Sequence, residues 1–122
     1  MGRSGEIVRD FVRAWSSLDV KKVCEFFTDD AVYHNMMLPP AAGKANVERA
    51  IQGFLAGWKD VEWELVNLVE SGDLVMAERV DRGVAGGKPF ALPVVGVFEL
   101  SGGKIRAWRD YFDLATYVKA VS

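Results

Sequence analysis

Five polar side chains in three separate motifs are of the types that acid–base catalysis uses. They are Tyr33 and Asn35 in Tyr-x-Asn, Arg79 and Asp81 in Arg-x-Asp, and Asp110 further along the chain. Each motif lies in a stretch that alternates as a β-strand does, so side chains two positions apart share a face. We therefore expect Tyr33 to point the same way as Asn35, and Arg79 the same way as Asp81.

Placed around one cavity, these side chains could activate water. Ionised Asp110 could take a proton from a water molecule that Tyr33 and Asn35 hold. Protonated Asp81 could donate to a leaving oxygen, and Arg79 between the two carboxylates would moderate their repulsion. Two carboxylates in a poorly solvated site have their pKa values pushed apart, so that one serves as acid and the other as base near neutral pH.

A structural role is the alternative for some of these groups. Arg79 and Asp81 could form an exposed ion pair at a sheet edge, which would contribute at most about 1 kcal/mol to stability. Asp113 is a rival to Asp110 as the base, but its position at a predicted helix start is typical of a capping carboxylate. We therefore favour Asp110 and assign Asp113 to the cap.

Neither a metal site nor a covalent nucleophile is expected. The single histidine, His34, alternates to the face opposite Tyr33 and Asn35, and no Ser-His or Cys-His pair joins the motifs. The only cysteine, Cys24, lies in a helical pattern, where a small buried side chain is the usual role. We expect a reaction by activated water, without a cofactor or a metal.

Apolar periodicity predicts the elements that must position these groups. Helical spacing predicts helices over residues 4–18, 19–27 and 46–58, with Ser4 and Asn46 as caps. Alternation predicts strands over residues 31–38, 61–70, 74–83, 89–100 and 104–112. Residues 28–30 and 84–88 are predicted as turns, and Asp113 begins a short C-terminal helix.

The order of these elements indicates an α+β fold. Amphipathic helices need a surface to cover, so the three helices of the N-terminal half should gather over one curved antiparallel sheet and leave a pocket at its concave face. No repeat, linker or low-complexity tract divides the chain, so we expect a single domain over residues 1–122. Pro93 cannot donate to a strand ladder and predicts an edge position or a bulge.

The last predicted strand indicates which face meets the pocket. Alternation places on one face Arg106, Trp108, Asp110 and Phe112. The two aromatic neighbours of Asp110 mark that face as the pocket side. Arg109 and Tyr111 fall on the other face and are expected at the surface or in a dimer contact. The tryptophans are expected in the core, and Trp58 could also rim the pocket.

Charge and composition exclude several classes of partner. The chain has 15 Lys and Arg against 17 Asp and Glu, a net charge of −2, and its basic residues form no run. Such a chain has no reason to bind nucleic acid or an anionic membrane surface. No apolar run approaches the roughly 18 residues of a spanning helix, and the first residues contain no apolar signal segment. We expect a cytoplasmic protein that does not contact membranes.

Taken together, the motifs resemble those of the limonene-1,2-epoxide hydrolases. The segments that carry the resemblance are Tyr33–Met36, Leu38–Ala41, Glu78–Asp81, Gly96–Leu100 and Trp108–Leu114. The family's order of Tyr-x-Asn, Arg-x-Asp and Trp-Arg-Asp-Tyr-Phe-Asp is kept, and the match runs from about Asp19 to the C-terminus. Each motif is weak alone, whereas the set is highly specific.

The resemblance implies a cone-shaped α+β fold of the nuclear-transport-factor-2-like type, with a curved mixed sheet, usually in a homodimer and without a cofactor. It implies that water opens a small hydrophobic epoxide in one step, with no covalent intermediate. Asp110 matches the family's base, Asp81 its acid and Arg79 its bridging arginine. Tyr33 and Asn35 match the residues that hold the water.

The same resemblance implies which residues contact the substrate. Leu92, Val94 and Phe112 are similar to positions that line the family's pocket, and Met36 is expected beside them. The family's longer apolar segment after Arg-x-Asp is here the glycine-rich Arg82–Gly87. Such a segment would widen or loosen one wall of the pocket.

Two other functions of the same fold stay open at this stage. A ketosteroid-isomerase-like or polyketide-cyclase-like enzyme would use an aspartate to move a carbon-bound proton, with Tyr33 steadying an oxyanion. A non-catalytic ligand-binding module would accelerate no reaction. Arg79 between two carboxylates favours the epoxide hydrolase, because neither alternative requires that arrangement.

Overall fold

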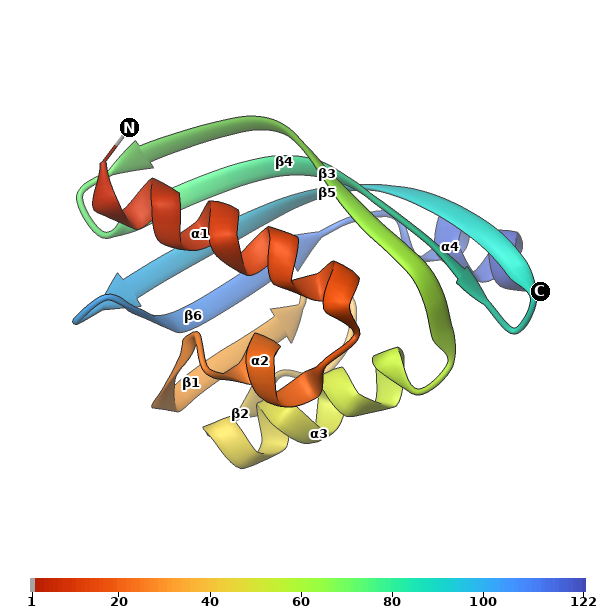
Figure 1. Ribbon diagram of the computed structural model, residues 1–122, viewed down its shortest axis with the longest axis horizontal. Helices are drawn as coiled ribbons and strands as arrows, with labels where there is room; N and C mark the ends of the chain where they lie inside the picture. The colour runs from red at the N-terminus through yellow and green to blue at the C-terminus, as the bar shows by residue number, and fades with distance from the viewer. Residues whose placement is uncertain (1) are drawn as a thin grey trace.

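A curved six-stranded β-sheet forms the frame of the computed structural model, which describes residues 2–122 (Figure 1). The strands are β1 Phe27–Asn35, β2 Ala41–Ala42, β3 Trp58–Ser71, β4 Leu74–Ala85, β5 Lys88–Ser101 and β6 Lys104–Tyr111. The helices are α1 Arg3–Ala14, α2 Val20–Cys24, α3 Lys44–Leu55 and α4 Leu114–Val121, with a 3-10 turn, η1, at Trp15–Ser17. The predicted α+β class, a curved sheet with helices in the N-terminal half, is confirmed.

The sheet is mixed because one pair of its strands runs parallel. The strand order is β2-β1-β6-β5-β4-β3, and all neighbours are antiparallel except β1 and β6. Short hairpins fix the alternating directions of β3 to β6, whereas β1 reaches them through α3 and is free to pair in parallel. The purely antiparallel sheet that periodicity suggests is therefore wrong at β1, while the mixed sheet implied by the resemblance is confirmed.

Irregularities in β3 curve the sheet. β3 shifts its register against β4 between Lys59 and Glu62 and again between Leu65 and Asn67. Asp60, inside the first of these irregularities, has a left-handed φ of 53°. Each β-bulge bends its strand and increases the local twist. The long strands therefore wrap around the helices and leave a concave face (Figure 1).

The concave face is covered by α1, α2 and α3, whereas α4 lies at the far end of the molecule near the C-terminus (Figure 1). α1 packs on β3 and β4, and α3 packs on β1. Phe11 of α1 is fully buried, and its ring meets Trp15, Phe27, Phe98 and Trp108 edge-on. This aromatic cluster is the core between α1 and the sheet.

Two predicted helix caps are wrong, because contacts from elsewhere replace them. Ser4 lies inside α1 and does not cap it; the carboxylate of Glu70 on β3 accepts from the backbone N–H of Gly5 at 3.2 Å instead. Asn46 lies inside α3, where its side-chain amide donates to the carbonyl oxygen of Ala42 at 2.8 Å. The negative carboxylate of Glu70 at the start of α1 also suits the helix dipole.

Two predictions about strands are also wrong, and in both places the strand register is irregular. The predicted turn at residues 28–30 is wrong because the chain stays extended through β1, although its pairing with β6 shifts between Phe27 and Val32. Arg106 is not on the pocket face; it is exposed and donates to Glu99 at 2.5 Å. The register of β5 and β6 shifts near this position, so alternation fails there and buried Ile105 faces inward instead.

Pro93 and the glycine-rich segment behave as local backbone rules require. β5 lies inside the sheet, yet β6 ends at Tyr111, opposite Val95, so Pro93 has a strand partner only on the β4 side. The predicted edge position is thus confirmed locally.

Gly86 and Gly87, with φ of 59° and 81°, form the two-residue turn between β4 and β5. Because β4 pairs with β5 as far as this turn, the segment is an ordered ladder and not a loose loop.

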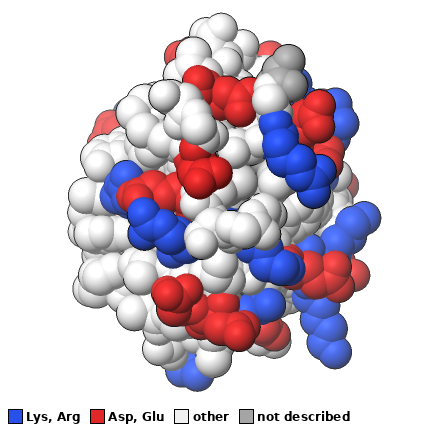
Figure 2. Space-filling model, turned by 90° about the vertical axis from the view of Figure 1, so that its left-hand side faces the viewer, with Lys and Arg blue, Asp and Glu red and all other residues white. Residues whose placement is uncertain are grey.

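Within residues 2–122, the helices are all too short or too polar to cross a membrane. Figure 2 looks at the end of the molecule that carries the N-terminus, and acidic and basic side chains are interspersed over that face. Nucleic-acid recognition relies on clustered basic charge. The mixed charges of this face do not provide it.

Candidate active site

A buried arginine joins two buried carboxylates on the concave face of the sheet. Arg79 is 1% exposed, Asp81 5% and Asp110 3%. The guanidinium donates to Asp81 through Nε at 2.7 Å and Nη2 at 3.1 Å. It donates to Asp110 through Nη1 at 3.0 Å and Nη2 at 2.5 Å. Both contacts are bidentate, the strong geometry for this pair of groups. The exposed ion pair considered as an alternative is therefore excluded.

A glycine on β5 makes room for this ion pair. Arg79 and Asp81 come from β4 and Asp110 from β6, so their contact crosses the intervening strand. Gly96 on β5 pairs directly with Asp110. A Cβ at Gly96 would lie 2.6 Å from Arg79 Nη1 and 2.9 Å from Asp110 Oδ1. Only a residue without a side chain fits there while the carboxylate and the guanidinium touch.

Two indole rings complete the surroundings of the guanidinium. The Cζ atom of Arg79 lies 4.4 Å from the ring centre of Trp63 and 5.6 Å from that of Trp108, within the range of cation–π attraction. Trp108 Nε1 also donates to Asp110 Oδ1 at 2.6 Å. The sequence analysis places Trp108 in the core and on the face of Asp110, without a polar role. The signal for its polar role is the Trp-x-Asp spacing, which puts both side chains on one face of β6.

The two carboxylates have different environments. Asp110 accepts two hydrogen bonds from Arg79 and one from Trp108, whereas Asp81, among residues 2–122, accepts from Arg79 alone. Burial raises the pKa of Asp81 to about 7; the charge of Arg79 opposes this rise, and the charge of Asp110 adds to it. Near neutral pH a substantial fraction of Asp81 is therefore protonated and able to donate.

Tyr33 and Asn35 face Asp110 from the neighbouring strand. The parallel pairing of β1 with β6 sets Tyr33 opposite Trp108 and Asn35 opposite Asp110. The Tyr33 ring stacks on Trp108 with 4.1 Å between ring centres, and its hydroxyl donates to Asn35 Oδ1 at 3.1 Å. Burial, followed by the charge of Asp110, raises the pKa of the Tyr33 hydroxyl, so it stays protonated. The Asn35 amide group and the Tyr33 oxygen can together hold a water molecule.

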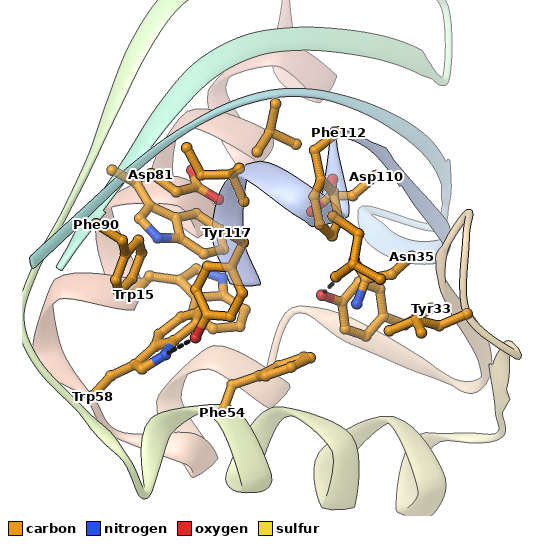
Figure 3. A pocket seen from close by; sticks show the side chains of 15 residues that line it. Trp15, Tyr33, Asn35, Phe54, Trp58, Asp81, Phe90, Asp110, Phe112 and Tyr117 are labelled. Carbon is orange, nitrogen blue, oxygen red and sulfur yellow. Dashed lines mark hydrogen bonds between the residues drawn. The ribbon is translucent and has the colours of Figure 1, made fainter. Parts of the chain in front are cut away.

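These polar groups lie on the wall of a cavity between the sheet and the helices (Figure 3). Its lining residues are Trp15, Tyr33, Asn35, Leu38, Phe54, Trp58, Trp63, Asp81, Phe90, Leu92, Val94, Asp110, Phe112, Leu114 and Tyr117. The cavity leaves about 80 Å³ for the centres of water-sized molecules. One water needs about 10–15 Å³ on this measure, so there is room for an organic molecule besides water. An apolar wall with a few convergent polar groups is typical of a ligand site.

Three of the four residues expected at the substrate line the cavity, namely Leu92, Val94 and Phe112. Met36 does not. β1 ends at Asn35 and the chain turns, with Leu38 N–H donating to the Asn35 carbonyl oxygen at 2.8 Å. That turn brings Leu38 to the cavity and leaves Met36 36% exposed, which corrects the expectation for Met36.

Much of the aromatic wall escapes sequence reasoning. Trp15, Phe54, Phe90 and Tyr117 belong to η1, α3, β5 and α4, and they meet only because the sheet curves (Figure 3). No motif connects them in the sequence. Trp58 is the exception, because its position next to a predicted helix end already suggests the rim. Asp113, the rival base, is an exposed cap that accepts from the backbone of α4.

Within residues 2–122, no group of three or more His, Cys, Asp and Glu side chains could hold a metal ion. The two carboxylates of the site are both held by Arg79. His34 lies apart from them, with Nε2 2.9 Å from the carbonyl oxygen of Leu38. Because the positive charge of Arg79 already pairs with both carboxylates, the site suits a neutral ligand better than a cation.

This chain is similar to known proteins in both sequence and fold. The family model of the SnoaL-like domain matches residues 8–108. Epoxide hydrolase EphG of Mycobacterium tuberculosis is 31% identical over 117 residues, which are 93% of this chain and 76% of that protein. The structure of an M. tuberculosis LEH-like epoxide hydrolase is similar with a TM-score of 0.85 and 27% identity, covering 98% of this chain and 89% of that one.

Another similar structure shows that the fold alone does not define a reaction. A putative polyketide cyclase from Xanthomonas campestris pv. campestris has a TM-score of 0.83 and 22% identity, covering 98% of this chain and 97% of that chain. At this identity the likeness extends to the fold only. The reaction must therefore be argued from the residues of the cavity.

Replacing Gly96 with alanine should disrupt the site, because the new methyl group would collide with Arg79 and Asp110. We expect Gly96→Ala to lower the free energy of unfolding by about 1–3 kcal/mol, as overpacking typically does. Urea denaturation measures this loss. Gly53→Ala is the matched control, because nothing lies within 4 Å of its added Cβ. Equal stability of the two variants would contradict the close approach at Gly96.

Proposed function

The chain belongs to the SnoaL-like domain family, and we propose that it is an epoxide hydrolase that converts a small hydrophobic epoxide into a vicinal diol. The observation that carries this proposal is Arg79, which holds two buried carboxylates of unequal environment at a mostly apolar cavity. The motifs that resemble the limonene-1,2-epoxide hydrolases and the likeness to EphG support the same reaction.

Asp110 acts as the base in the proposed reaction. A water molecule lies between Asp110, Asn35 and Tyr33, all of which line the cavity. Asp110 takes one of its protons as the water oxygen attacks an epoxide carbon. Tyr33 and Asn35 fix the direction of attack, because their mutual hydrogen bond and the stacking on Trp108 leave them little freedom.

Asp81 acts as the acid. The epoxide carbon–oxygen bond breaks as the oxygen takes the proton of Asp81, so no free alkoxide forms. The product is a diol, with Asp110 left protonated and Asp81 left ionised. A proton then returns from Asp110 to Asp81 before the next turnover. Arg79 bonds both carboxylates and stabilises the negative charge on either one.

The substrate is proposed to resemble limonene epoxide in being small and apolar. Leu92, Val94 and Phe112 line the cavity next to the carboxylates and would contact its hydrocarbon part. The proposed steps require only water and the side chains of the chain itself, so the reaction needs neither a cofactor nor a metal. Cys24, a free and buried thiol, is compatible with a reducing compartment, and we place the reaction in the cytoplasm.

Asp110→Asn tests the base. The amide keeps the shape of the carboxylate but cannot take the proton, so we expect diol formation to fall by at least about 100-fold. Chromatography of the diol measures the rate, and circular dichroism checks the fold. Asp113→Asn, at the exposed cap of α4, is the control and should keep near-normal activity. Near-normal turnover by Asp110→Asn would contradict the assignment of Asp110 as the base.

An enone assayed beside the epoxide separates hydrolysis from isomerase-like proton transfer.

A single turnover in oxygen-18 water distinguishes direct attack from a covalent route. We expect the label to appear in the diol in the first turnover, because water itself attacks the epoxide carbon. Mass spectrometry of the diol and of the digested protein measures where the label goes. Label found first in an aspartate, and only later in the diol, would contradict one-step hydrolysis.

The acid gives the reaction a pH dependence. Asp81 must be protonated to donate, and burial raises its pKa to about 7. As far as Asp81 alone determines the rate, we therefore expect kcat/KM to be constant below about pH 7 and to fall by ~10-fold for each pH unit above it. Initial rates between pH 6 and pH 9, with the protein shown to be folded throughout, measure the profile. A level profile up to pH 9 would contradict Asp81 as the donor.

We also propose that two copies associate through the outer face of the sheet. Apolar side chains are exposed there on neighbouring strands, namely Val69, Met76, Val95 and Tyr111. Adjacent apolar groups of this kind mark interaction surfaces, because covering them with a second copy removes them from water and lowers the free energy. Light scattering after gel filtration should give twice the 13.5 kDa mass of the chain. Met76→Lys should reduce the mass to that of one chain, whereas Ala115→Lys on α4 should not. A monomeric unmodified protein would refute the association.

A further inference from the structure

One wall of the cavity, the end wall, is formed by the aromatic side chains of Trp58, Phe90 and Tyr117. Trp58 Nε1, at the start of β3, donates to the hydroxyl of Tyr117 on α4 at 3.0 Å. Figure 3 shows this bond on the side of the cavity opposite Tyr33 and Asn35. Neither Trp58 nor Tyr117 has a role in the proposed reaction. Both nevertheless line the cavity.

The strand register places this end wall beyond Asp81. Asp81 on β4 pairs with Leu92, and Gly83 pairs with Phe90, two residues nearer the hairpin of β4 and β5. Trp58 pairs with Ala85, a further two residues along β4. At roughly 3.3 Å per residue, the wall begins about 7 Å beyond Asp81. A substrate whose epoxide lies at Asp81 would therefore meet the wall with the far end of its substituent.

Contacts between aromatic rings hold the end wall together. The Phe90 ring lies 5.1 Å from the centre of Trp58 and meets Tyr117 edge-on at 5.3 Å. Phe54 stacks on Trp58 from α3 at 5.6 Å. A Cβ at Gly83 would lie 2.8 Å from Cζ of Phe90, so the absence of a side chain there makes space for the Phe90 ring. Trp58 is therefore held on two sides, and Tyr117 is the member that can move.

Tyr117 can move because α4 is the least buried helix of the fold. It buries none of its residues fully. Its contacts are mainly with the open half of β5, beyond the end of β6, where it packs against Phe90, Leu92 and Val94. The bond from Trp58 ties α4 to β3 across the cavity. A neutral hydrogen bond of this kind changes an equilibrium by roughly 2- to 10-fold, so a ligand could displace it.

We propose that Tyr117, held by Trp58, determines the length of substrate that the cavity accepts. This inference rests on the proposed function and refines its substrate class. Epoxides that carry a single ring or a short chain fit between Asp81 and the wall. Epoxides with long straight chains must break the Trp58–Tyr117 bond and displace α4. Tyr117 is thus a specificity-determining residue, and it takes no part in the bond-making steps.

Two variants of Tyr117 test this assignment. Tyr117→Phe removes the hydrogen bond and keeps the ring, whereas Tyr117→Ala removes the wall. Lys119→Ala, exposed on the same helix, is the control. The substrates are the terminal epoxides of hexene, decene and tetradecene, with cyclohexene oxide as the compact reference. The readout is the ratio of kcat/KM for the longest chain to that for the shortest, which a general loss of stability would not change.

The unmodified protein should favour the short epoxides. Tyr117→Ala should raise the long-to-short ratio by about 10-fold or more, and Tyr117→Phe by roughly 2- to 10-fold, the worth of the lost bond. Lys119→Ala should leave the ratio unchanged. An unchanged ratio in both Tyr117 variants would overturn the proposal. Because Tyr117→Phe keeps the ring that packs on Phe90, it decides the question even where Tyr117→Ala fails to fold.

Binding measurements separate this proposal from the proposed function. Calorimetry with the straight-chain vicinal diols of the same lengths requires no turnover. If no epoxide is hydrolysed, the proposed function fails, and a gain in affinity for long diols in Tyr117→Ala would still support the end wall. Affinity that is independent of chain length in every variant, or no binding of any diol, would overturn the end wall.

Discussion

The structure depends on one interaction, the bidentate grip of the Arg79 guanidinium on Asp81 and Asp110 inside the core. A buried ion pair often adds nothing to stability, and well-packed apolar residues in its place are frequently as stable or more so. The charges must therefore be compensated locally. Every strand near them contributes. On β5, Gly96 has no side chain and so leaves room for the ion pair, and on β6 the Trp108 N–H donates to Asp110. The face of Trp63 from β3 covers the guanidinium.

This compensation is unequal, and the inequality gives the carboxylates different chemical properties. Asp110 accepts hydrogen bonds from two side chains and lies opposite Asn35, a polar residue. Asp81 meets Arg79 alone and lies opposite apolar Leu92, so burial raises its pKa to about 7. Two residues of the same type thus become suited to opposite proton transfers, because the protein surrounds them differently. The cavity adds an apolar wall, which keeps water scarce and strengthens these differences.

Alternation along single strands was enough to predict which polar residues share a face. Arg79 with Asp81 and Tyr33 with Asn35 follow from a period of two, and Asp110 follows from its aromatic neighbours on β6. The same rule fails at Arg106, because a shift in register against β5 reverses the alternation there. The expectation for Met36 came from the resemblance and not from alternation, which already places it on the face opposite Asn35; the turn at the end of β1 leaves it outside the cavity. Local periodicity is reliable only as long as the ladder is regular.

The sequence by itself determined the helices, the long strands, the α+β class and the residue types of an acid–base site. Those depend on periodicity and motif order, which are local. Only the tertiary structure decided that β1 runs parallel to β6, and this sets Asn35 opposite Asp110. It alone decided the bidentate geometry with which Arg79 holds both carboxylates, and that Trp58 meets Tyr117 across the cavity. Strand pairing and sheet curvature join residues far apart in the chain, and no spacing within a single segment encodes such contacts.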